Sequence, residues 1–109
     1  TLEYCLLKSG KGNNSRNEEW GGNIYSSGYD HITLNNCIIT GGQAGYGGGI
    51  YAVSMNSLKF RNCLFYNNSA INTGGAIYVN NTQTSIINCT IVDNSGSTYG
   101  AFRFNGCLS

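Results

Sequence analysis

The stretch Gly47-Gly48-Gly49-Ile50-Tyr51 decides the fold, because the chain contains three versions of it. It occurs earlier as Gly21-Gly22-Asn23-Ile24-Tyr25 and later as Gly74-Gly75-Ala76-Ile77-Tyr78, and Gly100-Ala101-Phe102-Arg103 is a degenerate fourth copy. The second glycine steps by 26, 27 and 25 residues from copy to copy. Self-similarity with a period of about 20–50 residues is typical of solenoids and other repeat architectures.

The cysteines show the same period independently of the glycines. Cys37, Cys63 and Cys89 are 26 residues apart and each follows an asparagine, while Cys5 begins the series. From each cysteine to the next glycine pair the steps are 17, 11, 12 and 11 residues. The first repeat therefore carries an insertion within residues 8–19, which holds five of the eleven charged residues of the chain.

The residue pattern of each repeat predicts short strands and not helices. Glycine pairs and frequent asparagines disfavour helix, whereas Ile32-Thr33-Leu34 and Leu58-Lys59-Phe60 alternate as strands do between Asn and Gly turns. We predict two or three strands per repeat, stabilised by stacking each repeat on the next in parallel, in-register columns about 4.8 Å apart. The predicted interior columns are Ile24/Ile50/Ile77/Phe102, Leu2/Leu34/Phe60/Ile86, Cys5/Cys37/Cys63/Cys89 and Leu7/Ile39/Phe65/Ile91.

A second motif accompanies the glycines. Phe65-Tyr66-Asn67-Asn68 precedes Gly74-Gly75-Ala76-Ile77; Ile91-Val92-Asp93-Asn94 matches it loosely, and Ile39-Thr40-Gly41-Gly42 lacks the asparagine. Over most of its length the chain resembles the right-handed, pectin-lyase-like parallel β-helices. Its repeats are similar to those of the polymorphic membrane protein family of chlamydial surface adhesins, which pairs Gly-Gly-Ala-Ile with Phe-x-x-Asn.

The fold class expected is an all-β, right-handed parallel β-helix solenoid of about four coils with about 26 residues each. We expect residues 1–109 to form a single β-helix domain, as a slice of a longer β-helix or a subunit of a fibre.

Two polar columns are expected to have structural roles. Asn36, Asn62 and Asn88 should form a ladder of stacked side-chain amides at a bend. Cys5, Cys37, Cys63 and Cys89 should form a ladder of reduced, buried thiols, because side chains in one column run parallel and do not face each other for a disulfide. An in-line column cannot build the tetrahedron that zinc requires, so we predict no metal site.

The tyrosines are the candidate binding residues. Tyr25, Tyr51 and Tyr78 each follow an inward-facing isoleucine and should point outward. A second aromatic column, Trp20, Tyr46 and Tyr99, precedes the glycines, with Thr73 in the third place. Two interpretations remain open: a platform for sugar rings or a partner protein, or cross-coil stacking that only stabilises the fold.

Groups for catalysis are few. The net charge of +1 gives no basic surplus for nucleic acid, and no apolar run is long enough to span a membrane. Asp30 and Asp93 are expected on different faces, and the one histidine, His31, is expected in a turn. No Ser-His-Asp or Cys-His arrangement can be built in register. We therefore predict no catalytic residue and no cofactor. The five carboxylates are Glu3, Glu18, Glu19, Asp30 and Asp93.

The function expected from these observations is that of a non-catalytic structural or adhesive module, extracellular or on the cell surface. Its partners would be copies of itself stacked end to end, or neighbouring coils of a longer chain, and surface glycans. The alternatives are a carbohydrate-binding module that uses the tyrosines, and a fragment of a polysaccharide lyase or hydrolase.

Overall fold

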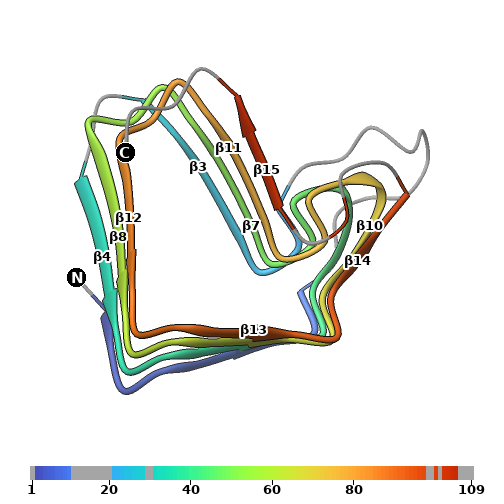
Figure 1. Cartoon of the computed structure of the whole chain (residues 1–109), viewed down its shortest axis with the longest axis horizontal. Helices are drawn as coiled ribbons and strands as arrows, with labels where there is room; N and C mark the ends of the chain where they lie inside the picture. Colours follow the sequence, from blue (N-terminus) through green and yellow to red (C-terminus); the bar gives the residue numbers. More distant parts are fainter. Residues whose placement is uncertain (1, 11–20, 29–30, 98–99, 101, 106–109) are drawn as a thin grey trace.

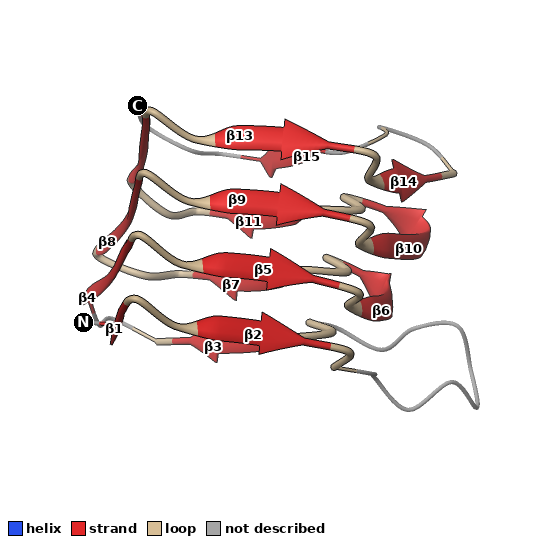
Figure 2. Cartoon of the chain, turned by 90° about the horizontal axis from the view of Figure 1, so that it is seen from below, coloured by secondary structure: helices blue, strands red, loops and turns tan. Residues whose placement is uncertain are grey.

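The fold is a right-handed parallel β-helix. The computed structural model describes residues 2–10, 21–28, 31–97, 100 and 102–105. All strand pairings in this part of the chain are parallel, and the strands form four sheets, which we name A to D in the order in which one coil passes through them (Figure 1). Figure 2 shows the coils as stacked layers. The expected fold class is therefore confirmed.

Each sheet collects the equivalent strand of successive coils. Sheet A contains β1 (Leu2–Glu3), β4 (His31–Asn35), β8 (Ser57–Arg61) and β12 (Thr84–Ile87). Sheet B contains β2 (Leu6–Lys8), β5 (Ile38–Thr40), β9 (Leu64–Tyr66) and β13 (Thr90–Val92). Sheet C contains β6 (Gln43–Tyr46), β10 (Ser69–Thr73) and β14 (Ser95–Gly96). Sheet D contains β3 (Ile24–Ser27), β7 (Ile50–Val53), β11 (Ile77–Asn80) and β15 (Phe102–Asn105).

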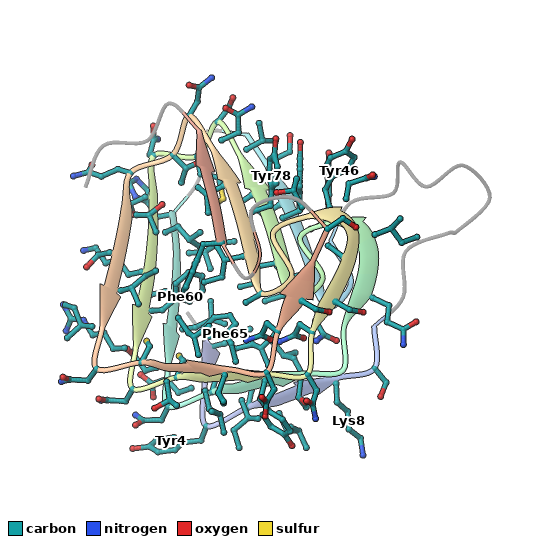
Figure 3. All side chains as sticks on the ribbon, turned by 45° about the vertical axis from the view of Figure 1, so that its right-hand side comes forward. Tyr4, Lys8, Tyr46, Phe60, Phe65 and Tyr78 are labelled. Atoms are coloured by element: carbon teal, nitrogen blue, oxygen red, sulfur yellow. The ribbon has the colours of Figure 1, made fainter. Side chains whose placement is uncertain are left out.

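The three non-cysteine interior columns lie in register as predicted. Strand pairing aligns Ile50 with Ile24 and Ile77, and the columns that contain Phe60 and Phe65 are equally continuous. Phe60 and Phe65 meet edge to face at 5.2 Å inside the stack (Figure 3). In the two middle coils these column residues are 0% exposed, so one narrow core runs along the axis. They are Leu34, Ile39, Ile50, Phe60, Phe65 and Ile77.

The prediction of two or three strands per coil was too low. Sheet C is the additional sheet, and its strands Gln43–Tyr46 and Ser69–Thr73 consist of polar or small residues apart from Tyr46 and Ile71. Such residues give no apolar alternation for sequence reasoning to detect. Their backbone groups nevertheless pair with the coils on either side, because each coil follows the path of its neighbour.

Each coil turns at four corners, and each corner contains a residue in the left-handed conformation. In the described part of the chain, every residue with positive φ belongs to one of four columns, and each column marks one corner. Glycine and asparagine dominate these positions because they adopt this conformation at the lowest cost. The columns are Tyr4/Asn36/Asn62/Asn88 between sheets A and B, Ser9/Gly41/Asn67/Asp93 between B and C, Gly21/Gly47/Gly74/Gly100 between C and D, and Gly28/Ser54/Asn81 between D and A.

The two glycines of each repeated pair are required for different reasons. Gly74 has a φ of 71° and makes the corner before sheet D. Gly48 stands where the chain passes very close to another segment: a Cβ atom there would lie 2.3 Å from the Ser69 carbonyl oxygen and 2.5 Å from that of Gly75. The glycine pair therefore recurs because one position bends the coil and the next lets two segments approach each other.

Candidate functional site

The tyrosines of sheet D form a continuous stack on the outside of the β-helix. Strand pairing places Tyr51 beside both Tyr25 and Tyr78. The rings of Tyr25 and Tyr51 are 5.6 Å apart with planes 2° from parallel, and those of Tyr51 and Tyr78 are 4.9 Å apart and 14° from parallel. The distance between successive coils, about 4.8 Å, is close to the separation that stacked aromatic rings prefer. The backbone of the β-helix therefore sets the spacing of the rings.

Tyr46 extends this stack through an edge contact with Tyr78. Its ring meets Tyr78 at 5.7 Å with planes 74° apart, and Figure 3 shows the two residues side by side at the surface. Tyr46 also pairs in register with Thr73 of the next coil. Trp20 and Tyr99, which were expected in the same column, lie outside the described residues. We name Tyr25, Tyr46, Tyr51 and Tyr78 the tyrosine cluster.

The stacking decides what the cluster presents to a partner. Neighbouring rings cover each other's faces, so the outer surface is built from ring edges and hydroxyl groups. Burial, with smaller contributions from Tyr78, Tyr25 and Tyr46, raises the pKa of Tyr51 above its usual value. The Tyr51 hydroxyl therefore stays protonated at neutral pH and can both donate and accept hydrogen bonds. The cluster therefore presents a row of hydroxyl groups above an apolar base, and it does not present a flat aromatic platform.

The column of thiols lies at the corner between sheets A and B. Cys5, Cys37, Cys63 and Cys89 are all free, and the two middle ones are buried. The Cys63 thiol contacts the carbonyl oxygens of Leu34 and Arg61, both at 3.3 Å, so it links its own coil to the preceding one. Burial raises the pKa of Cys63, which keeps the sulfur a neutral thiol and a poor nucleophile at neutral pH.

The asparagine column differs from the expected amide ladder. Asn36, Asn62 and Asn88 have exposed side chains and φ values of 51–55°, so they serve as the left-handed corner residues between sheets A and B. Asparagine is enriched in this conformation whether or not its amide has a partner. The hydrogen-bonded amide ladder lies at the next corner and consists of Asn23, Asn68 and Asn94.

Asn68 is the centre of this inner ladder. Its side chain is 1% exposed, and its Oδ1 accepts from the Gly42 backbone N–H at 3.0 Å. Its Nδ2 donates to the Ile39 carbonyl at 3.0 Å and to Asn94 Oδ1 at 2.9 Å, and Oδ1 also accepts from Asn23 at 3.4 Å. The amide thus uses its two donors and two acceptor sites fully.

Asn23 supplies the amide that the second coil lacks. In strand register the place of Asn68 is taken there by Gly42. Asn23 reaches the gap from the start of sheet D, where its Oδ1 accepts from the Gly10 N–H at 2.8 Å and its Nδ2 donates to the Thr40 carbonyl at 3.0 Å. The Phe-x-x-Asn motif indicated Asn68 and Asn94. Nothing in that motif points to Asn23, because it belongs to the glycine copy.

His31 also differs from its expected place. It begins β4 and is not in a turn, and its Nδ1 lies 2.8 Å from Ser57 Oγ on the next strand. Strand pairing therefore places a serine beside the histidine, a contact that the sequence analysis did not identify. Such a pair needs a third group to orient the imidazole for catalysis, and the described residues around it include no carboxylate. The shallow groove there is lined by His31, Asn56, Ser57, Leu58, Lys59, Gln83, Thr84, Ser85 and Ile86.

The described residues contain neither a metal-binding cluster nor a membrane-spanning helix. Within the described ranges, no three His, Cys, Asp or Glu side chains come together in a way that could hold a metal ion. No helix of sufficient length and hydrophobicity to cross a membrane occurs among them.

Comparison with known proteins identifies the family. Searches of the curated proteins and of the solved structures give no match. The family model described as a right-handed β-helix region matches residues 6–108. That range includes strands of all four sheets, Cys37, Cys63 and Cys89 of the thiol column, and the tyrosine cluster. The chain belongs to the right-handed β-helix family.

Proposed function

We propose that the chain is a non-catalytic structural module of an extracellular or cell-surface protein, with the tyrosine cluster as its contact surface for a partner. The observation that carries the proposal is the continuous stacking of apolar, thiol, amide and tyrosine side chains from coil to coil. Such a stack makes a rigid spacer, and its outward columns present the same chemical group at regular intervals.

Exposure at the outer coils supports a role within a longer stack. Leu34 is 0% exposed, but Leu2 in the same column is 39% exposed, and Ile86 and Phe102 are only partly buried where their middle-coil equivalents are fully covered. A further coil, from the same protein or from a second copy, would cover these side chains and continue the sheets. Head-to-tail contacts of this kind do not close, so repeated stacking produces filaments.

A carbohydrate-binding role for the same surface is the second candidate, and the tyrosines favour it. Sugar hydroxyls can exchange hydrogen bonds with the row of tyrosine hydroxyls, and the apolar base can accept the C–H face of a sugar. The resemblance to the chlamydial adhesins, carried by Phe65-Tyr66-Asn67-Asn68 and Gly74-Gly75-Ala76-Ile77, supports adhesion and a surface location. A role as a fragment of a polysaccharide lyase or hydrolase has no comparable support.

The size of the native particle tests the structural role. We expect the purified chain of residues 1–109 to form elongated particles by light scattering and negative-stain microscopy. A chain that stays monomeric at high concentration would contradict stacking.

A glycan array tests the contact surface. Tyr51→Ala removes the middle ring of the stack and should abolish any signal that the tyrosine cluster produces. Tyr4→Asn is the matched control, because Tyr4 is 80% exposed but lies at a corner between sheets A and B, away from the cluster. Loss of signal in both variants, or in neither, would exclude the cluster as the binding surface.

A further inference from the structure

The outer face of sheet B carries an apolar patch that the proposed function does not use. Its strands alternate, so the middle residue of each points into the core while the flanking residues point out. Leu6 is 55% exposed, Ile38 37% and Val92 44%, and Leu64 and Tyr66 are half-buried between them. We name these five residues the sheet B patch. Contiguous exposed apolar surface of this kind marks an interaction site.

Opposite charges stand at the two ends of this patch. Lys8 is the last residue of β2 in the first coil, and Figure 3 shows it on the outer side of sheet B. Asp93 is exposed at the corner directly after β13 in the fourth coil. Strand pairing links Lys8 through Thr40 and Tyr66 to Val92, the neighbour of Asp93. The two charges therefore occupy nearly the same place along the strand but lie three coil steps apart, about 14 Å.

We infer that two copies of the chain pair through their sheet B patches with their helix axes antiparallel. A two-fold axis along the strand direction, between the second and third coils, exchanges the first coil with the fourth and the second with the third. This rotation brings Ile38 of each copy against Leu64 of the other. It also brings Lys8 of each copy against Val92 and Asp93 of the other, so two opposite-charge contacts form at the rim of an apolar centre.

Sheet A does not offer an equivalent apolar surface. Strand pairing places Glu3, Asn35, Arg61 and Ile87 in one outward column and Thr33, Lys59 and Ser85 in another, and of these residues only Ile87 is apolar. Charged and polar side chains contribute little to the buried centre of a protein contact. The apolar character of its outer face therefore selects sheet B as the pairing face, and the positions of Lys8 and Asp93 favour the antiparallel orientation.

The size of the patch sets the strength of the pairing. Four coils are about 19 Å tall, and a coil edge of about five residues is about 17 Å long. The flat footprint of about 300 Å² is below the roughly 800 Å² per partner that a stable dimer buries. We therefore expect weak pairing between copies of these four coils, detectable only at high protein concentration.

Sedimentation equilibrium of the 109-residue chain, up to about 1 mM, tests the inference. We expect lateral association that Ile38→Ser weakens at least about tenfold. Ile87→Ser is the matched control, because Ile87 is 43% exposed on sheet A and its substitution should leave association unchanged. Circular dichroism establishes that both variants remain folded.

Charge variants test the orientation. Lys8→Glu places two like charges together in each pair and should weaken association about threefold to tenfold. Asp93→Asn introduces the residue that Asn67 already provides at this corner, and in the Lys8→Glu background it should restore part of the lost association. Recovery in the double variant distinguishes this geometry from nonspecific apolar contact.

Three results would overturn the inference: a chain that remains monomeric throughout, association equally sensitive to Ile87→Ser and Ile38→Ser, or a Lys8→Glu defect that Asp93→Asn does not relieve. Filaments that grow equally well in the wild type and in Ile38→Ser would exclude lateral pairing and leave end-on stacking intact. Conversely, a saturating dimer sensitive to Ile38→Ser, without elongated particles, would support lateral pairing and contradict end-on stacking.

Discussion

Two asparagine columns run along this β-helix at neighbouring corners, and they have opposite roles. Asn62 has a φ of 55° and an exposed side chain, and the same holds for Asn36 and Asn88. Asn68, six residues later, is 1% exposed and places its amide in the middle of the inner ladder. In the first column asparagine is used for its backbone, and in the second for its side chain.

The difference shows why recurrence alone does not reveal a residue's role. Asn36, Asn62 and Asn88 recur at the coil period and for that reason predict an amide ladder, whereas the inner ladder is interrupted in sequence at Gly42. The corner residue is left-handed and points its side chain to solvent, whereas the residue after the next corner points inward, where the Gly42 N–H and the Ile39 carbonyl would otherwise have no partner. Substitutions that preserve one property and remove the other separate the two roles.

Asn68→Ala should have the largest effect. It removes a fully bonded buried amide and leaves the Gly42 N–H and the Ile39 carbonyl without partners. We expect the free energy of unfolding to fall by about 3–4 kcal/mol, measured by urea denaturation. Asn62→Ala is the matched control with the same change in chemistry. Equal losses in the two variants would show that the columns do not differ in role.

Gly42→Asn should rank next, although it completes the motif in the second coil. A Cβ atom at position 42 would lie 1.9 Å from the Gly48 carbonyl oxygen and 2.9 Å from Asn23 Nδ2. The nearer obstacle is backbone and cannot move cheaply, so we expect a loss of about 2–3 kcal/mol. The same urea titration measures it. A stabilised variant would mean that the ladder tolerates a second amide beside Asn23.

Asn23→Ala should cost less than Asn68→Ala. Its bonds to Gly10, Thr40 and Asn68 are only partly buried, so water can replace some of them. We expect a loss of about 1.5–2 kcal/mol. Hydrogen exchange of the Gly10 amide provides a local readout, because Asn23 Oδ1 accepts from that N–H. Unchanged protection of Gly10 in the variant would contradict the bridging role.

Most of the fold could be predicted from the sequence, because in-register stacking converts a linear period directly into columns. Ile50, Phe60 and Phe65 were placed correctly for this reason alone. Sheet C could not be predicted, since strands such as Ser69–Thr73 form through backbone pairing and have no apolar pattern. Tyr25, Tyr51 and Tyr78 were predicted to point outward, but how the rings stack depends on side-chain angles that alternation does not specify.

Sequence reasoning also could not predict that Asn23, from another part of the coil, takes the place of the amide missing at Gly42. Asn23 and Gly42 are 19 residues apart, and only the close approach at the glycine corner brings them together. A motif compared column by column records Gly42 as a missing asparagine. The physical requirement is a hydrogen-bonding amide at that point in space, and a side chain from either side can meet it.

Asn62 separates backbone from side-chain effects in a second way. Asn62→Gly should change the free energy of unfolding by less than about 0.5 kcal/mol, because glycine adopts positive φ without strain. Asn62→Ala should lose about 1 kcal/mol, because alanine does not. At Asn68 both substitutions should be strongly destabilising. Urea titrations of the four variants check this, and a tolerated Asn68→Gly would contradict the distinction.

Tyr4→Asn should have the smallest effect and the opposite sign. Tyr4 occupies the corner column of Asn36, Asn62 and Asn88 with a φ of 53°, a conformation in which a bulky side chain is strained. Its ring is 80% exposed, so little buried surface is lost with it. We expect a gain of about 0.5–1 kcal/mol in the free energy of unfolding. Tyr4→Ala removes the same ring but keeps a residue unsuited to positive φ, and it should give no such gain. If the two variants are equally stable, the corner preference for asparagine does not extend to the first coil, and strain at Tyr4 is relieved by local movement of β1.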